Sequence, residues 1–544
     1  MGTMAQVFPS EQKLLGAFYT PVALAEHLVA WAIQDSASRV LEPACGEAVF
    51  LAAAARRLAD LGAPGELVER NLVGYELDPN ATAGAAEMLA RDFGLRPSLA
   101  AASFFDVEPP DPGERFDAVV GNPPWIRYHH FGGATRWQAQ RVAEDAGARL
   151  TGLASSWAAF VIHAASFLKP HGRLGFVLPA ELLATDYAES VRRFLTQRFA
   201  ETVVVTFRDR VFPGALVDAV LVMAAGEGPG SVEVVEVHDA AALNGLTRGT
   251  SSSGAGKWSH MLLPAEAAAV YSRVGAHQAV RRLGSAFSVD IGMVTGANQF
   301  FVIDRSTRRR FRLQADTRPV LPKSTPLGAV YRATDWRSAA QAGERAWFFM
   351  PRSDSGGAHD YIEWGQSRGF DRPYKCRERK VWWKLRDFVP PDFFLSYMAH
   401  KAPRFAANEA RAGSTNLVHH VKAVEALGLP GSAVAAGFYN SLTLLSAELE
   451  GRAYGGGVLK LETKEAERLR LPLDVDRTVW AELDRRADLV DAAVRRGDFE
   501  MAADLIDPIV LGQGLGLDAG ERAALRAGWR LMRTRREERG RSRP

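Results

Sequence analysis

Asn122, Pro123, Pro124 and Trp125 stand directly after an apolar run, "FDAVVG", that predicts a buried strand. Proline removes a backbone donor and fixes φ, and the residue before a proline is pushed towards extended geometry, so the strand has to end here. The chain therefore places a rigid, hydrogen-bonding corner and a large flat ring at the end of a core strand. The chemistry of such a corner depends on the groups that lie beside it.

Polar groups also follow the other predicted strands. The turn "EPACGEA" follows the first, Glu76 and Asp78 follow the second, and Asp106 follows "SFF". Taken singly, the turn could be an ordinary strand-to-helix turn, Glu76 and Asp78 could be solvated acids, and Asp106 could be a helix cap. Together they suit a nucleoside-type ligand, because a carboxylate at the end of a second strand accepts ribose hydroxyls and a further acid accepts from an exocyclic amine. The turn and the helix N-terminus favour the anionic end of the ligand.

Alternating strands and helices are what must position these groups. The alternation predicts an α/β fold with a mostly parallel sheet and helices on both faces, in which ligands bind beyond the carboxyl ends of the strands. The expected strands lie within residues 39–46, 72–79, 103–107, 116–124, 173–179, 201–207 and 218–226, and the expected helices within residues 48–62, 80–94 and 155–172.

Bulk properties are those of an ordinary globular protein. The 544 residues suffice for two to four domains, and the composition is 47% hydrophobic and 24% charged, with a net charge of +3. We find no apolar run that would span a bilayer and no secretory pattern. Two cysteines exclude a disulfide framework and suit a reducing cytoplasm. No metal site is predicted, since the pairs His129–His130 and His419–His420 are adjacent, which is not ligand spacing on one helix face.

The chain resembles the gamma class of N6-adenine DNA methyltransferases, which use S-adenosylmethionine. Residues 17–32 look like its N-terminal cofactor motif, "VLEPACGEAVFL" like its glycine motif, "GYELDP" like its ribose-binding acid and "SFFD" like its adenine-binding acid. "NPPW" matches its catalytic tetrapeptide, and residues 205–222 look like the later motif whose phenylalanine faces the target base. The family often has a second glycine where this chain has Ala48.

The resemblance implies a class I methyltransferase fold and a role for each motif residue. In the family mechanism the Asn122 side chain and the Pro123 carbonyl accept hydrogen bonds from the two N–H groups of the target amine. Trp125 and Phe212 stack on the flipped base. Catalytic residues are expected at Asn122, Pro123, Pro124, Trp125 and Phe212. Cofactor-binding residues are expected at Tyr19, Thr20, Pro21, Glu42, Pro43, Ala44, Cys45, Gly46, Phe50, Glu76, Phe105, Asp106 and Asn122.

The second half of the chain has a different residue pattern from the first. Residues 243–258 predict a linker or flexible loop. Beyond them, basic residues interleave with aromatic ones, which suits a nucleic-acid groove. DNA-binding residues are expected at Arg308, Arg310, Arg377, Arg379, Lys380 and Lys384. We expect a catalytic domain over 1–265, a mixed α+β target-recognition domain over 266–475, and a helical segment with a basic tail over 476–544.

The expected function is methyl transfer to N6 of adenine in a short sequence of double-stranded DNA. The resemblance implies a restriction–modification or phage-defence setting with a cognate restriction endonuclease as a partner. N4-cytosine methylation uses the same amine chemistry and stays open, as does an enzyme with the same tetrapeptide that acts on RNA or on protein glutamine. A non-catalytic DNA-binding subunit is disfavoured by the intact "NPPW". C5-cytosine methylation is disfavoured because it needs a cysteine nucleophile, whereas Cys45 belongs to the cofactor turn.

Overall fold

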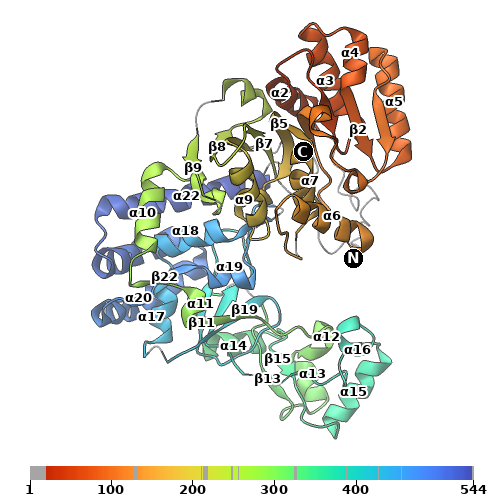
Figure 1. Cartoon of the computed structure of the whole chain (residues 1–544). Helices are drawn as coiled ribbons and strands as arrows, with labels where there is room; N and C mark the ends of the chain where they lie inside the picture. The colour runs from red at the N-terminus through yellow and green to blue at the C-terminus, as the bar shows by residue number, and fades with distance from the viewer. Residues whose placement is uncertain are drawn as a thin grey trace. The chain divides into compact units, whose positions relative to one another are not determined.

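The structure is a computed structural model that divides into two compact units (Figure 1). It describes residues 20–126, 132–152, 154–209, 211, 218–246, 249–254, 256–323, 327–386, 389–426, 428–454 and 456–541. Tyr19, His129, His130 and Phe212 lie outside the described residues. The first unit runs to Leu262 and includes the chain from Glu538 onward, and the second is Leu263–Glu537. The domain limits expected from the sequence remain predictions.

One nine-stranded sheet forms the centre of the first unit, in the order β3-β2-β1-β4-β5-β7-β6-β8-β9. Strands β1 to β5 pair in parallel, as do β6 and β8, whereas β7 is antiparallel to both of its neighbours and β9 is antiparallel to β8. The strands are β1 Val40–Glu42, β2 Leu72–Glu76, β3 Ser98–Ala101, β4 Phe116–Gly121, β5 Leu168–Pro179, β6 Glu201–Phe207, β7 Ala219–Ala225, β8 Ser231–Val237 and β9 Thr250–Ser252. The predicted α/β fold with a mostly parallel sheet is confirmed.

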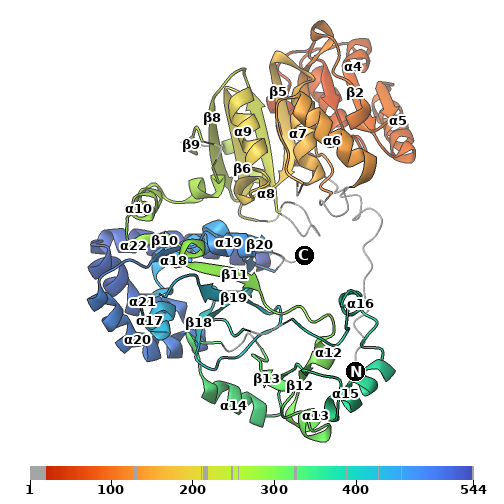
Figure 2. The same ribbon diagram turned by 60° about the horizontal axis from the view of Figure 1, so that its bottom comes forward.

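Helices cover this sheet and bury its apolar strands. The helix α2 packs against α3 and against β4 and β5, while α7 and α9 contact each other and lie in front of the strands in Figure 2. The helices are α2 Val22–Ala32, α3 Val49–Asp60, α4 Gly65–Asn71, α5 Pro79–Phe93, α6 Gly133–Asp145, α7 Ser156–Ala165, α8 Glu181–Ala184 and α9 Glu189–Arg198. All ten residues of α7 are buried, so this helix is a core element rather than a surface one.

Three segments differ from the prediction. The helix expected within residues 155–172 ends at Ala165, and β5 begins at Leu168. Residues 103–107 were expected to be a strand, but Phe104–Asp106 form a 3-10 turn and the third strand lies just before it, at Ser98–Ala101. Consecutive side chains of a strand point to opposite faces. Phe104 and Phe105 instead both pack against Phe160 of α7, with ring centroids 5.7 and 4.6 Å away. Burial of two adjacent rings on one side favours the turn.

The segment 243–258 was expected to be a linker, yet part of it belongs to the first unit. Its strand β9 pairs with β8 at the sheet edge. Trp258 is 1% exposed and donates its indole N–H to the carbonyl of Gly254 at 3.0 Å. The Ser and Thr residues of β9 give no apolar alternation, because an exposed edge strand buries little, and so its pattern resembled a loop.

The second unit combines small sheets with helices. Its largest sheet has the order β11-β19-β16-β18-β14. These strands are β11 Phe287–Ile291, β14 Val330–Tyr331, β16 Phe393–Ser396, β18 Phe405–Asn408 and β19 Val418–Ala423. The smaller sheets comprise β10 Val280–Arg282, β12 Val302–Ile303, β13 Thr317–Pro319, β15 Trp347–Phe349, β17 Met398–Ala399, β20 Arg452–Tyr454, β21 Val458–Lys460 and β22 Arg470–Pro472.

Helices surround these sheets and close the second unit. Along the chain they are α10 Ala265–Gly275, α11 Leu283–Ala286, α12 Asn298–Phe301, α13 Arg305–Arg310, α14 Ala333–Gln341, α15 Gly357–Ser367, α16 Tyr374–Arg377, α17 Gly431–Gly437, α18 Ser441–Glu450, α19 Thr463–Glu467, α20 Arg477–Arg496, α21 Phe499–Asp507 and α22 Ala519–Arg541. Val479 and Trp480 of α20 share one hydrophobic cluster with Phe393 and Leu395 of β16. The helices beyond position 476 therefore share a core with the preceding strands.

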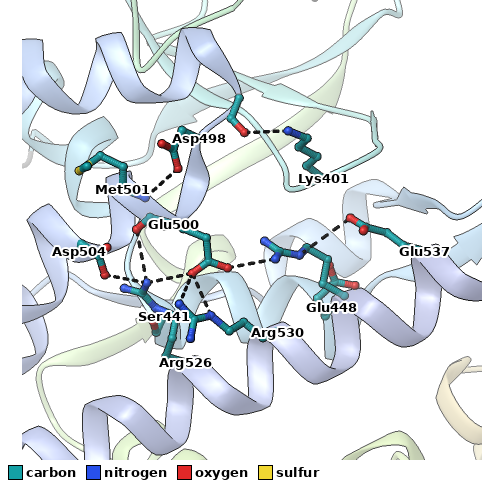
Figure 3. A network of polar contacts seen from close by, with 12 residues as sticks. Lys401, Ser441, Glu448, Asp498, Glu500, Met501, Asp504, Arg526, Arg530 and Glu537 are labelled. Atoms are coloured by element: carbon teal, nitrogen blue, oxygen red, sulfur yellow. Dashed lines mark hydrogen bonds and ion pairs between the residues drawn. The ribbon is translucent and has the colours of Figure 1, made fainter.

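Buried ion pairs anchor α22 in the second unit (Figure 3). Arg526 donates to Ser441 at 2.7 Å, to Asp504 at 2.9 Å and to Asp507 at 2.8 Å. Arg536 pairs with Glu448 at 2.8 Å, and both side chains are buried. The basic stretch expected to be a tail is thus a helix over its described length. None of the helices in the described parts of the chain is long and apolar enough to cross a membrane.

Candidate active site

Backbone hydrogen bonds close the turn after β1, and α3 begins directly after this turn. Cys45 N–H donates to the carbonyl of Tyr75 at 2.8 Å, and Ala48 N–H donates to the carbonyl of Cys45 at 2.6 Å. Gly46 and Ala48 have φ of 49° and 61°, in the left-handed region that favours glycine. The position where the family often has glycine is thus one where an alanine costs about 1–2 kcal/mol of backbone strain.

Glu76, at the end of β2, holds this turn through its carboxylate. One of its oxygens accepts from Gly46 N–H at 2.9 Å. The other accepts from Leu77 N–H at 2.8 Å and from Asp78 N–H at 3.1 Å. The side chain is half-buried, so three backbone donors fix the carboxylate at the edge of the sheet while part of it stays open to solvent.

A second carboxyl group, that of Glu42, lies beneath the turn at 2% exposure. Burial raises its pKa well above its usual range, and the charge on Glu76 raises it further, whereas a hydrogen bond from Leu51 N–H opposes the rise. Burial likewise raises the pKa of the Cys45 thiol, so that thiol stays neutral at pH 7. Both shifts disfavour the charged form, so Glu42 and Cys45 keep their protons to a higher pH than exposed groups of the same type.

The corner after β4 lies against these residues. A Cβ placed on Gly121 would come within 3.6 Å of the side chains of both Glu42 and Pro43. Asn122 donates from its amide nitrogen to the hydroxyl of Thr20 at 3.1 Å. The structure therefore brings the predicted segments around Thr20, Glu42 and Asn122 to one edge of the sheet.

Ser156, the first residue of α7, holds the rest of the corner. Its hydroxyl donates to the carbonyl of Pro124 and accepts from Ile126 N–H, the latter at 2.9 Å. Trp125, between them, is 8% exposed and packs in the core of the first unit. Sequence reasoning missed Ser156, since a serine at the start of a helix is common. Pairing with a loop 30 residues away leaves no local signal.

The predicted adenine-binding acid, Asp106, ends the 3-10 turn and is exposed. Gln138 of α6 donates its side-chain amide to this carboxylate. The turn is also tied to α7 by His163, whose Nε2 lies 3.2 Å from the carbonyl of Phe104 and 3.0 Å from that of Val107. Neither Gln138 nor His163 was predicted. Two other predicted cofactor residues are core positions, since Phe50 is 1% and Phe105 4% exposed.

The six predicted DNA-binding residues fall into two groups. Arg308 stacks over the ring of Trp347 at 3.9 Å and donates to Thr317 at 2.8 Å. Arg379 donates to the carbonyls of Val294 at 2.9 Å and Trp382 at 3.3 Å. Both guanidinium groups therefore have structural partners. The remaining four are exposed: Arg310, Arg377, Lys380 and Lys384.

A groove of about 540 Å³ lies beside Arg379 in the second unit. Its lining includes Asp290, Ile291, Val294 and Arg386. Ile291 and Val294 are each 47% exposed, so two apolar side chains of this lining are open to solvent. Across the described ranges no group of three or more His, Cys, Asp and Glu side chains is placed to hold a metal ion.

Two family models match the chain, one for each half. Residues 2–244 match the model described as N-6 DNA Methylase. Residues 255–511 match the C-terminal domain of Type II methyltransferase M.Eco57I. Together they span both compact units.

Relatives and solved structures agree with these matches. The chain is 28% identical over 490 residues to Type II methyltransferase M.XamI of Xanthomonas campestris pv. amaranthicola, covering 84% of this chain and 85% of that protein. It is 32% identical to Type II methyltransferase M.TthHB8I of Thermus thermophilus over 38% of this chain and 44% of the relative. A solved structure of the Type IIL restriction-modification enzyme MmeI in complex with DNA aligns with a TM-score of 0.58, 12% identity and coverage of 97% of this chain and 80% of that chain. At that identity the likeness concerns the fold.

Proposed function

Because the chain is an N6-adenine DNA methyltransferase of the restriction–modification type, we propose that the residues at the edge of the first sheet move a methyl group from S-adenosylmethionine to N6 of an adenine in double-stranded DNA. The first unit has the class I methyltransferase fold expected from the sequence. The observation that carries the proposal is the position of Asn122, which is hydrogen-bonded to Thr20 and directly follows Gly121, whose backbone lies against Glu42 and Pro43.

The donor and acceptor groups at the ends of β1 and β2 fit S-adenosylmethionine. A Cβ on Gly46 would meet no atom within 4 Å, so there is open space in front of the turn. Glu76 would accept from the ribose hydroxyls and Asp106 from the adenine amine. The N–H groups at the start of α3 favour the carboxylate end. When bound, S-adenosylmethionine supplies an electrophilic methyl group on a sulfonium sulfur.

The corner at Asn122 makes the target amine a better nucleophile. The lone pair of an adenine amine is delocalised into the ring, which makes the nitrogen a poor nucleophile. The side-chain oxygen of Asn122 and the carbonyl of Pro123 accept hydrogen bonds from its two N–H groups, and this localises the lone pair on nitrogen. Acceptors on a fixed backbone are preorganised, and the position of the amine carries much of the rate.

The target base has to leave the duplex to reach this corner. Trp125 stacks on one of its faces and Phe212 covers the other, which is worth about 1–3 kcal/mol per stacked base. Because Trp125 is 8% exposed, its ring has to be uncovered when DNA binds. The exposed Arg310, Arg377, Lys380 and Lys384 of the second unit contact phosphates.

The reaction belongs in the cytoplasm, where it marks chromosomal DNA, and a cognate restriction endonuclease acts at the same sequence. Single-molecule sequencing of DNA from an otherwise methylation-free host tests the product. We expect N6-methyladenine in one short motif, because each mismatched base pair costs about 1–3 kcal/mol. Methylated cytosine would favour the N4-cytosine alternative. Methyl transfer to RNA or protein, with no change in DNA, would overturn the proposal.

The role of Asn122 is tested by Asn122→Ala, with Asn80→Ala, an exposed asparagine of the first unit, as the control. We expect the first variant to lose methyl transfer while cofactor affinity stays within a few-fold, because the side chain holds the amine. The control should keep both. Substantial turnover in Asn122→Ala would contradict the assigned role.

A further inference from the structure

Ser156 makes hydrogen bonds to both ends of the segment 124–126. Its hydroxyl donates to the carbonyl of Pro124 and accepts from Ile126 N–H at 2.9 Å. Its own N–H donates to the carbonyl of Ile126 at 3.0 Å. One residue therefore fixes the chain immediately after the Asn122–Pro123 acceptor pair. Its side chain uses both the donor and the acceptor capacity of a hydroxyl.

The helix that carries Ser156 is buried and is held by further hydrogen bonds. Ser156 is 1% exposed, and every residue of α7 is buried. The next residue, Trp157, donates from its indole to the hydroxyl of Tyr187 at 3.1 Å, and that hydroxyl donates to Glu181. Glu181 lies two residues after the carboxyl end of β5, the strand parallel to β4. The first turn of α7 is thus tied both to the corner and to the neighbouring strand end.

We propose that Ser156 is a positioning residue for methyl transfer, acting by holding the Asn122–Pro123 acceptors where the target amine needs them. The inference rests on the proposed function. Asn122 is held from one side by Thr20, and the backbone that follows Pro123 is held from the other by Ser156. Without the Ser156 hydroxyl, the Pro124 carbonyl and the Ile126 N–H lose their partner, and the corner can shift while the rest of the site stays in place.

The test compares Ser156→Ala with wild type in single-turnover methyl transfer at saturating DNA and S-adenosylmethionine. A displacement of about 1 Å near reacting groups lowers a rate by up to about a hundredfold. We expect the rate to fall roughly 10- to 100-fold, with the dissociation constants for S-adenosylmethionine and for DNA within twofold of wild type. Ser156→Thr, which keeps the hydroxyl, should recover most of the rate.

Ser166→Ala is the matched control. Ser166 lies directly after α7, and its hydroxyl donates to the carbonyl of His163 at 2.6 Å, so this variant loses a serine hydrogen bond at the other end of the helix. We expect it to keep the wild-type rate. Equal rate losses in the Ser156→Ala and Ser166→Ala variants, or a wild-type rate in Ser156→Ala, would overturn the proposal.

A measurement on the wild-type protein covers the case in which Ser156→Ala fails to fold. The amide of Ile126 donates to Ser156 although it lies outside any helix or strand. Hydrogen exchange should find it strongly protected, and exchange at the rate of an open loop would overturn the proposal. If wild-type protein itself methylates no DNA, the proposed function fails; if wild type is active and Ser156→Ala matches it, the inference alone fails.

Discussion

Asn122 donates a hydrogen bond from its amide nitrogen to the hydroxyl of Thr20, 3.1 Å away, and the two residues are 102 positions apart in the chain. The bond sets the orientation of a group whose two ends differ chemically. With the nitrogen directed at Thr20, the oxygen of the amide is the end that the proposed mechanism uses as the acceptor for an amine. In that mechanism the residue before α2 helps to determine the chemistry at the end of β4.

Replacing Thr20 tests this orientation. Thr20→Val keeps the shape and removes the acceptor, so the amide of Asn122 loses its fixed orientation. We expect methyl transfer at saturating substrates to fall about tenfold, equivalent to roughly 1.4 kcal/mol, a typical contribution of one hydrogen bond. Thr20→Ser keeps the hydroxyl and should stay near the wild-type rate. Equal rates in the two variants would contradict the role of the bond.

Glu76→Gln tests the carboxylate that closes the turn after β1. The amide keeps one acceptor oxygen but replaces the other with a donor, which faces backbone N–H groups of Gly46 or of Leu77 and Asp78. We expect affinity for S-adenosylmethionine to fall at least tenfold and DNA affinity to stay unchanged. Asp78→Asn, which preserves a helix cap two residues away, is the control. If calorimetry found the wild-type affinity for S-adenosylmethionine in Glu76→Gln, the role of Glu76 would be purely structural.

Cofactor affinity should depend on pH through Glu42. Burial raises the pKa of this carboxyl well above its usual range, so in the free protein Glu42 keeps its proton to a higher pH than an exposed glutamate does. If Glu42 ionises to meet the ammonium group of S-adenosylmethionine, binding releases that proton. Affinity then rises with pH until the raised pKa is passed, and levels off above it. Titrations of S-adenosylmethionine affinity from mildly acidic to mildly alkaline pH should show this rise in wild type and a flatter profile in Glu42→Gln. Identical profiles would count against a role in binding.

Lys380 and Lys384 should contribute to DNA affinity by binding phosphates. The double variant Lys380→Glu/Lys384→Glu reverses two exposed charges in the second unit. We expect weaker binding and a salt dependence shallower by about 0.9 for each phosphate that is no longer neutralised. Lys323→Glu reverses one exposed lysine, paired with Glu344 elsewhere in the same unit, and should leave the slope unchanged. A wild-type slope in the double variant would mean that these lysines face away from DNA.

The second unit should lose stability in mild acid because of His420. Burial lowers the pKa of this imidazole to about 4, and the charges of Lys422 and Arg386 act in the same direction. Between the ordinary histidine pKa of about 6.5 and the lowered value, the unfolded chain binds more protons than the folded one. The stabilisation is therefore complete above about pH 6.5 and is lost as pH falls towards 4, in all roughly 3 kcal/mol.

Urea unfolding of wild type and His420→Gln at pH 7 and pH 4.5 measures the effect of this histidine. The folded state uses its neutral form, since Ser414 N–H donates to its Nε2 at 3.2 Å. We expect the glutamine variant to lose less stability between the two pH values. Buried His163 and His419, whose pKa values burial also lowers, add the same trend to both proteins. An equal pH dependence in the two proteins would exclude His420 as a source.

Much of the first unit was predictable because burial leaves a local pattern. The apolar run before Asn122 does form β4, and the polar residues after β1, β2 and β4 do lie at one sheet edge, as the rule for parallel strands predicts. The catalytic and binding roles of those residues stay predictions.

Partners distant in the chain were not predictable in this way. Arg308 and Arg379 looked like free charges, yet a tryptophan face and backbone carbonyls bind their guanidinium groups. Ser156 and Gln138 carry no periodic signal, because one hydrogen bond to a loop changes neither hydrophobicity nor spacing. Such interactions depend on the folded arrangement rather than on a local pattern.

The ion pair between Arg536 and Glu448 gives the codon at position 536 an importance that a stretch rich in basic residues would not suggest. Loss of the Arg536 guanidinium alone would leave Glu448 as a buried, unpaired carboxylate, which typically costs about 3–5 kcal/mol, and a stop codon before position 536 would remove the whole ion pair together with the end of α22. Such an allele would make a less stable methyltransferase rather than a harmlessly shortened one. In a lineage that carries a nuclease of the same specificity, selection would preserve the reading frame through this codon.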